Sequence, residues 1–151
     1  MYTEANYLYF TGQDTNGDGW IDRDFGAVDI GSDIAGTSYD VAHVQWGGLW
    51  VMPSRDRLAE LKEHCTREWT TVNGVNGTLV TGPSGGQIFL PTAGYRTRDY
   101  FVLAGSEGYY WSSTQYPDDS YDAYHLRFFS GSWYWGGDYR YHGLFVRTVC
   151  P

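Results

Sequence analysis

The last third of the chain, residues 109–149, places the tightest limits on how this protein can fold. It opens within GYYWSST and continues through SYDAYHLRFFSGSWYWGGDYRYHGLFVRTV, so aromatic residues there alternate with Asp, Ser, Gly, His and Arg. Half of the chain's aromatic residues lie between Tyr109 and Phe145. In binding surfaces, rigid Tyr and Trp side chains supply contact area and small polar residues supply adaptable hydrogen bonds. We therefore predict a recognition module, with the rest of the chain as its scaffold.

The length of 151 residues predicts a single domain over residues 1–151, large enough to fold without metal or disulfide. Aromatic residues make up 19% of the chain and it has 20 glycines, a composition that favours short strands and turns. We expect residues 1–32 to be a less well-defined leading segment. Two early helices followed by antiparallel strands predict an α+β fold.

The charge balance argues against two classes of partner. Eighteen acidic residues against 10 basic ones give a net charge of −8, which repels phosphate backbones and anionic lipid, so we expect no nucleic acid partner. No apolar run reaches the ~18 residues of a membrane helix, so we expect no membrane insertion. The start MYTEANYLYF lacks the basic and apolar regions of a signal peptide.

Two segments have helical patterns. Residues 36–46 are predicted to form the first helix, capped by Thr37 or Ser38, and Gly47-Gly48 ends it. Residues 54–66 are predicted to form the second, with Ser54 as its N-cap. The side chains expected to face the core are Val41, Val44 and Trp46 in the first helix and Leu58, Leu61 and Cys65 in the second. Residues 49–52 read as a short buried strand.

Turn signals divide the rest of the chain into short strands. Asn73-Gly74, Asn76-Gly77 and Gly82-Pro83 are typical turn dipeptides. Four strands are then expected in YYWSS, AYHLRFF, SWYWG and LFVRTV.

A metal site is one of two interpretations of the Asp-rich segment near the N-terminus. Its order D-x-N-x-D-G-x-I-D matches the first nine positions of an EF-hand calcium loop, with Asp14, Asn16, Asp18 and Asp22 as candidate calcium ligands. Phe25 stands where the bidentate Glu would be. The alternative is an ordinary Asx-rich surface turn that holds no ion.

The two cysteines, Cys65 and Cys150, are either free thiols or one long-range disulfide, and we favour unpaired thiols. Catalytic patterns are weak. Asp118-Asp119 are adjacent in a loop, Ser112-Ser113 lack the G-x-S-x-G elbow, and no Cys/His zinc spacing occurs. We therefore expect no enzyme.

Several motifs occur together in one order: DIAGTSYDVAHVQWGGLWVMPS, NGVNG, FLPTAGYR, GYYWSST and GLFVRTV. In the order of these motifs, residues 33–149 resemble the Fibrobacter succinogenes major paralogous domain family, which is common in gut Bacteroidetes and their phages. The resemblance implies a C-type-lectin-like fold akin to that of formylglycine-generating enzymes. In such a fold two helices pack on a small twisted antiparallel sheet, and a long irregular region binds the ligand.

Residues 109–149 also resemble the variable region of a diversity-generating retroelement target protein. Adenine-specific errors turn template AAY codons into NNY codons, which never encode Lys, Gln, Glu, Met or Trp. Residues 116–149 contain no Lys, Gln, Glu or Met, and no Asn follows Asn76. Only Trp133 and Trp135 lie outside the NNY set, so the resemblance implies that both belong to a fixed scaffold.

Strand alternation separates core from surface in this region. Tyr124, Leu126 and Phe128 are expected to share the core face, whereas His125, Arg127 and Phe129 share the other. We also assign Trp111, Trp133, Trp135 and Phe145 to the core. The candidate ligand-binding residues are Tyr116, Asp118, Asp119, Tyr121, Asp122, His125, Arg127, Phe129, Ser130, Ser132, Tyr134, Asp138, Tyr139, Arg140 and His142.

The resulting hypothesis is a binding domain that recognises a protein or glycan on a cell surface, as a phage receptor-binding or bacterial adhesin module. By resemblance it would be extracellular, on a cell surface or on a virion. Two alternatives remain open: a non-diversified structural or interaction domain of a surface protein, and a degenerate formylglycine-generating-type enzyme.

Overall fold

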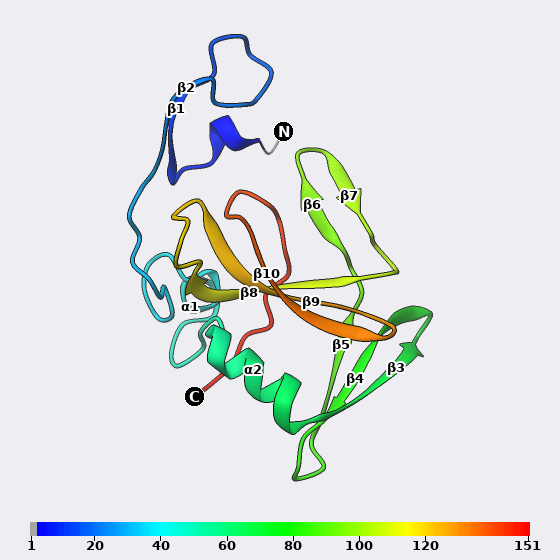
Figure 1. Ribbon diagram of the computed structural model, residues 1–151. Helices are drawn as coiled ribbons and strands as arrows, with labels where there is room; N and C mark the ends of the chain where they lie inside the picture. Colours follow the sequence, from blue (N-terminus) through cyan, green and yellow to red (C-terminus); the bar gives the residue numbers. More distant parts are fainter. Residues whose placement is uncertain (1–2) are drawn as a thin grey trace.

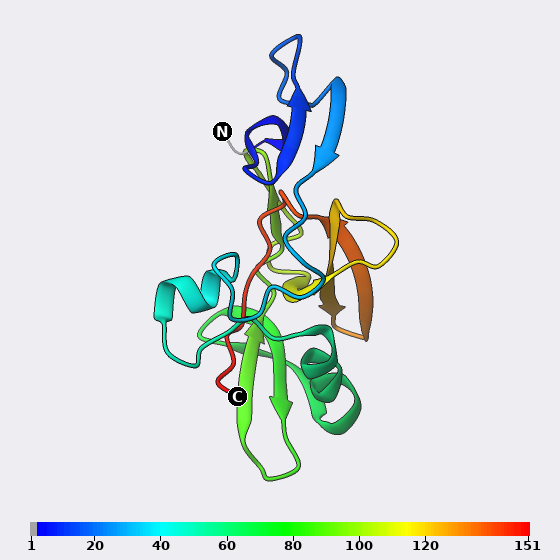
Figure 2. The same cartoon turned by 90° about the vertical axis from the view of Figure 1, so that its left-hand side faces the viewer.

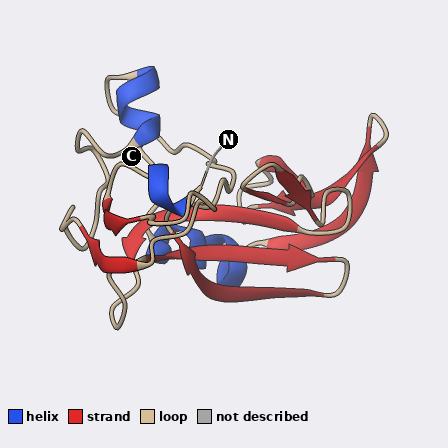
Figure 3. Cartoon of the chain, turned by 90° about the horizontal axis from the view of Figure 1, so that it is seen from above, coloured by secondary structure: helices blue, strands red, loops and turns tan. Residues whose placement is uncertain are grey.

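The computed structural model describes residues 3–151 and is mostly β, with 43% strand and 13% helix (Figures 1 and 3). The expected α+β, C-type-lectin-like fold is therefore wrong. In the described residues the strands are divided among four small antiparallel sheets, so there is no single sheet for two helices to cover. The α-helices are short and provide little of the ordered backbone.

The N-terminal segment forms a small unit of its own at one end of the molecule (Figure 2). A 3-10 helix, Glu4–Asn6, precedes the hairpin of β1 (Phe10–Gln13) and β2 (Arg23–Ala27). The Asp-rich loop connects these two strands. Residues 3–32 thus contain a paired hairpin.

The first helix, α1 (Val41–Trp46), is shorter than predicted because Asp40 caps it instead of Thr37 or Ser38. Its buried carboxylate accepts hydrogen bonds from four N–H groups, so residues 36–40 wrap around it as a loop. Only Ala42 of α1 is buried. The predicted inward side chains are exposed, as are two from the expected buried strand: Val41, Val44, Trp46, Leu49 and Trp50.

The second helix, α2 (Arg55–His64), matches its prediction closely. Ser54 caps it by accepting a hydrogen bond from the Arg57 N–H, and Leu58 is buried in the core. Leu61 and Cys65 pack against the same cluster. Neither helix in the described residues has the length and apolar character that a bilayer crossing requires.

Two further sheets follow α2 in the chain. The first pairs β3 (Thr66–Val72), β4 (Val75–Thr81) and β5 (Gln87–Pro91), and β6 (Tyr95–Thr97) pairs with β7 (Tyr100–Val102). Asn73-Gly74 forms the predicted β3–β4 turn, with positive φ at both residues. Asn76-Gly77 lies inside β4, so its predicted turn is wrong.

The fourth sheet carries the aromatic region, in the order β10–β9–β8 (Figure 1). Its strands are β8 (Gly108–Gln115), β9 (Asp122–Phe129) and β10 (Ser132–Tyr139). The inner face of this sheet packs against α2 and β4–β5 to form the main hydrophobic cluster: Leu58, Val80, Leu90, Tyr110, Leu126, Phe128 and Trp133. Each such large side chain contributes roughly 1.5–3 kcal/mol when fully buried.

The final residues tie the parts together instead of forming the predicted regular strand. Gly143 pairs with Arg96 of β6, Phe145 pairs with Tyr110 of β8, and Val149 pairs with Val51. Figure 2 shows this red segment running through the middle of the molecule.

Candidate functional site

The face of the β8–β9–β10 sheet that points away from the core is built by strand register. Tyr109, Arg127 and Tyr134 lie side by side across the three strands, and Trp111, His125 and Gly136 form the next row. The predicted alternation of β9 is confirmed in part: Leu126 and Phe128 are on the core side and fully buried, whereas Tyr124 is only half-buried and His125 is buried on the opposite side. We call this opposite side the outer face.

A charged network fixes one row of the outer face. The Arg127 guanidinium donates to both carboxylate oxygens of Glu107, at 2.6 and 3.0 Å, and the Tyr109 hydroxyl donates to Glu107 at 2.9 Å. The hydrogen bonds from Arg127 lower the pKa of Glu107 below its ordinary value. Burial and the hydrogen bond to Glu107 raise the pKa of Tyr109. Arg127 is therefore held in one position, as a bidentate pair requires.

A hollow of about 310 Å³ lies over this network. His125 was predicted to be exposed, but it is 5% exposed and lies beneath Gly136. A Cβ on Gly136 would come within 2.6 Å of the His125 ring, so the glycine leaves the room that the imidazole occupies. Burial lowers the pKa of His125, which keeps the ring neutral at pH 7. The lining residues are Tyr95, Tyr109, His125, Arg127, Tyr134, Trp135, Gly136, Gly137 and Asp138.

A second hollow, of about 360 Å³, surrounds the β9–β10 turn. Lys62 and Arg67 line it, and they place positive charge beside aromatic side chains in a protein of net charge −8. Tyr134, 48% exposed, lines both hollows and stacks on Phe129 with ring centroids 5.7 Å apart. We call the two hollows and their lining residues the outer-face surface.

Two candidate residues hold the N-terminal hairpin instead of facing solvent. The Tyr121 ring stacks on Phe25 at 4.3 Å. Arg140 is 8% exposed, donates to the Tyr9 and Val28 carbonyls, and lies over the Phe10 ring. Neither residue lines the two hollows of the outer-face surface, so their assignment to that solvent-facing set is corrected, because the hairpin docks on them.

The remaining candidates lie at the ends of the strands. Tyr139 is exposed, and His142 pairs with Asp138 through Nδ1 at 2.7 Å. Tyr116 packs on Tyr124 at 4.7 Å. Asp118 and Ser130 are exposed, and Asp122 and Ser132, the first residues of β9 and β10, are half-buried. Asp119 accepts a hydrogen bond from the Tyr121 N–H.

The core assignments are correct only in part. Phe128 and Trp133 are buried, and Trp111 and Trp135 are half-buried. Phe145 is 42% exposed, so its assignment was wrong: its backbone bridges to Tyr110 while its side chain reaches solvent.

Sequence reasoning missed several residues of the outer-face surface. Tyr109 stands at the start of the aromatic region and could have been included on that ground, and Glu107, which holds Arg127 in place, lies just before it in the sequence. Tyr95, Lys62 and Arg67 come from β6, α2 and β3, and nothing in their local sequence distinguishes them from surface residues.

The Asp-rich loop closes on itself. The Asp14 carboxylate accepts from the Gly17 and Gly19 N–H groups at 2.7 and 2.8 Å, and Asn16 and Asp18 accept from backbone N–H groups two residues ahead. The hydrogen bonds that Asp22 accepts from Thr15 lower the pKa of Asp22. No three acidic, histidine or cysteine side chains in residues 3–151 are grouped to hold a metal. The loop's own N–H groups therefore bond these side chains, as they do in an ordinary Asx-rich turn.

The remaining reactive side chains are separate. Cys65 and Cys150 are free thiols. The Ser112 hydroxyl donates to the Tyr124 carbonyl, as expected of a strand serine. What the outer-face surface offers is contact area, hydrogen bonds and charge.

Comparison with family models, with curated proteins and with solved structures finds no match to this chain.

Proposed function

We propose that this domain binds a protein or glycan on a cell surface through its outer-face surface, as a phage receptor-binding or bacterial adhesin module. The observation that carries the proposal is Tyr134, a large exposed aromatic side chain shared by two adjacent hollows on a sheet whose other face is core. A binding surface needs a rigid support, and this sheet provides one.

The chemistry of the surface supports recognition. Phe129, Tyr134 and Tyr95 supply stiff aromatic area, whereas Arg127 and Asp138 supply directional polar contacts. Interfaces take most of their binding energy from a few aromatic and Arg side chains. Because Arg127 is already paired with Glu107, ordering it costs little on binding.

The positions of Trp133 and Trp135 support diversification of this face, as the resemblance to retroelement target proteins implies. Both are the residues that NNY codons cannot encode, and both pack with the core cluster. The half-buried Phe129 and the exposed Tyr134 and Tyr139 would then be the diversified positions.

A non-diversified interaction domain with one fixed partner is the second candidate. The burial of His125 and Arg140 favours it, because both lie within the stretch expected to vary and both are needed by the fold. The gene neighbourhood separates the two. A reverse transcriptase gene, with a near-copy of codons 109–149 differing only at adenines, supports diversification, and its absence supports the fixed partner.

The binding test uses the whole chain against glycan arrays and intact bacterial cells. Replacing Phe129 and Tyr134 of this surface, together with Tyr139 at the adjoining end of β10, with Ser should lower affinity for any ligand found by about 30-fold or more, since each hot-spot side chain contributes ~2 kcal/mol. The matched control replaces Leu8, Tyr100 and Phe101, which are more exposed and lie outside this surface, with Ser. Loss of binding in the control alone would overturn the proposal.

A further inference from the structure

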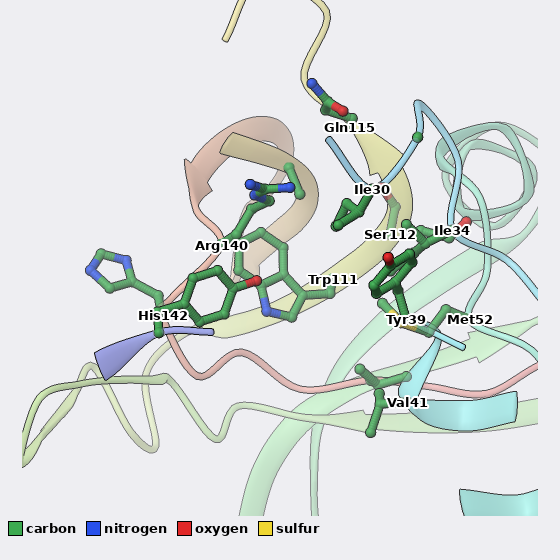
Figure 4. A pocket seen from close by; sticks show the side chains of 15 residues that line it. Ile30, Ile34, Tyr39, Val41, Met52, Trp111, Ser112, Gln115, Arg140 and His142 are labelled. Atoms are coloured by element: carbon green, nitrogen blue, oxygen red, sulfur yellow. The ribbon is translucent and has the colours of Figure 1, made fainter. Parts of the chain in front are cut away.

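A separate cavity of about 240 Å³ lies between β8, the start of α1, residues 30–34 and the turn after β10 (Figure 4). Apolar side chains form most of its wall: Ile30, Ile34, Met52, Trp111 and Val146. Cavities of ~150 Å³ accommodate benzene, and drug-sized ligands occupy roughly 300–1,000 Å³. The cavity therefore fits a molecule with about one ring.

Two polar side chains in the wall have unsatisfied atoms. Ser113 is 3% exposed, and its hydroxyl has no hydrogen-bond partner among residues 3–151. The Nε of Arg140 likewise has no partner in the described chain. Buried polar atoms are normally paired, because leaving one unpaired costs roughly 1–3 kcal/mol.

The charge of Arg140 is also unbalanced. No carboxylate in residues 3–151 lies within ion-pair distance of its guanidinium, and the cavity wall contains no Asp or Glu. Its contacts to the Val28 and Tyr9 carbonyls are long, at 3.3–3.4 Å. Burial lowers the pKa of Arg140, and electrostatic interactions with Tyr7, Asp119 and Asp29 oppose this shift. Buried charges are usually paired.

We propose that this cavity binds a small organic carboxylate with an apolar body of about one ring. The carboxylate accepts hydrogen bonds from Arg140 and Ser113, and the body packs against Trp111 and the aliphatic wall. Figure 4 shows the matching arrangement, with Arg140 and Trp111 on one side of the space and Ile34, Tyr39 and Met52 on the other. This inference stands apart from the proposed function, since Ile34, Met52 and Ser113 lie outside the outer-face surface.

The test titrates 3-phenylpropionate into the full chain to about 10 mM and follows the melting temperature, which rises with any ligand that binds the folded state. The neutral match is 3-phenylpropanol, and acetate tests the anion alone. We expect 3-phenylpropionate to bind about tenfold or more tightly than the alcohol, since a charge-assisted contact is lost in the alcohol. No shift with 3-phenylpropionate, or an equal shift with the alcohol, would overturn the proposal.

Two variants locate the binding. Ser113→Ala removes a hydroxyl that has no partner, so it should fold normally and weaken 3-phenylpropionate binding about 3- to 10-fold. Val41→Trp fills the exposed mouth of the cavity and should abolish binding. The Ser substitutions of Phe129, Tyr134 and Tyr139 should leave it unchanged. Equal affinity in wild type, Ser113→Ala and Val41→Trp would place the ligand elsewhere and refute the assignment.

Discussion

Asp40 shows how one buried side chain sets local structure in this protein. Its carboxylate accepts from the N–H groups of Gly36, Ala42, His43 and Met52, and so joins the loop, the helix start and the segment after the helix. We predict that Asp40→Ala lowers the free energy of unfolding by about 3 kcal/mol, because several buried donors lose their acceptor. Urea denaturation measures this, with the exposed Asp56→Ala as control. Equal, small effects for both would contradict it.

Asp122 should make the stability of the fold depend on pH. Burial, with Asp119 and Asp138 nearby, raises the pKa of Asp122 from 3.8 to about 6. Because the folded-state pKa is the higher one, the charged form disfavours folding above pH 6, and stability rises as pH falls from 6 to 4. Asp122→Asn should therefore melt higher than wild type at pH 7.5, and the difference should vanish below pH 4. A difference that is the same at all pH values would refute this account.

At the scale of elements, close strand packing in the outer face depends on Gly136. A methyl group there would meet the buried His125 ring, so Gly136→Ala should cost about 2 kcal/mol, as overpacked sites do. Gly131→Ala, in the turn of the same hairpin, meets nothing within 4 Å and should stay within ~0.5 kcal/mol. Thermal denaturation compares them. Adding His125→Ser should restore most of the loss at Gly136, and equal costs at the two glycines would contradict the packing.

The Asp-rich loop carries a prediction about metal. Because its carboxylates are bonded to the loop's own N–H groups, EDTA should leave the melting temperature unchanged in calcium-containing buffer. A fall with EDTA that Asp18→Ala abolishes would establish the calcium site instead.

Elements were predictable where the signal was local. Ser54 and the spacing of Leu58 and Leu61 correctly predict α2, and Asn73-Gly74 predicts its turn. The predicted start of the first helix is wrong because Asp40 caps it instead of Thr37 or Ser38. The Asp40 carboxylate also accepts hydrogen bonds from the Met52 N–H, which fixes this side chain at the helix start. That contact joins residues 12 apart, which no local pattern contains.

For the whole molecule, the sequence correctly predicts β-rich structure after residue 66 but not how the strands are grouped. Single bridges, such as those of Gly143 to Arg96 and Phe145 to Tyr110, connect the C-terminal segment to the β6–β7 and β8–β10 sheets, and they have no periodicity to detect. The candidate site shows the same division. Alternation in β9 identifies Arg127 and Phe129. In contrast, His125 packs beneath Gly136 of another strand, and Tyr121 and Arg140 pack against the N-terminal hairpin, contacts that alternation within one strand cannot predict.

The central claim is that the aromatic residues Phe129, Tyr134 and Tyr139 of the β8–β10 sheet serve recognition and are not required for folding. The most direct measurement is a display library in which single positions carry NNY codons, sorted for protease resistance. Phe129, Tyr134 and Tyr139 should tolerate nearly every encoded residue, since surface changes usually stay within ~0.5 kcal/mol, whereas Leu126 and Phe128 should tolerate few. If these three positions prove as restrictive as the two fully buried ones, the claim is contradicted.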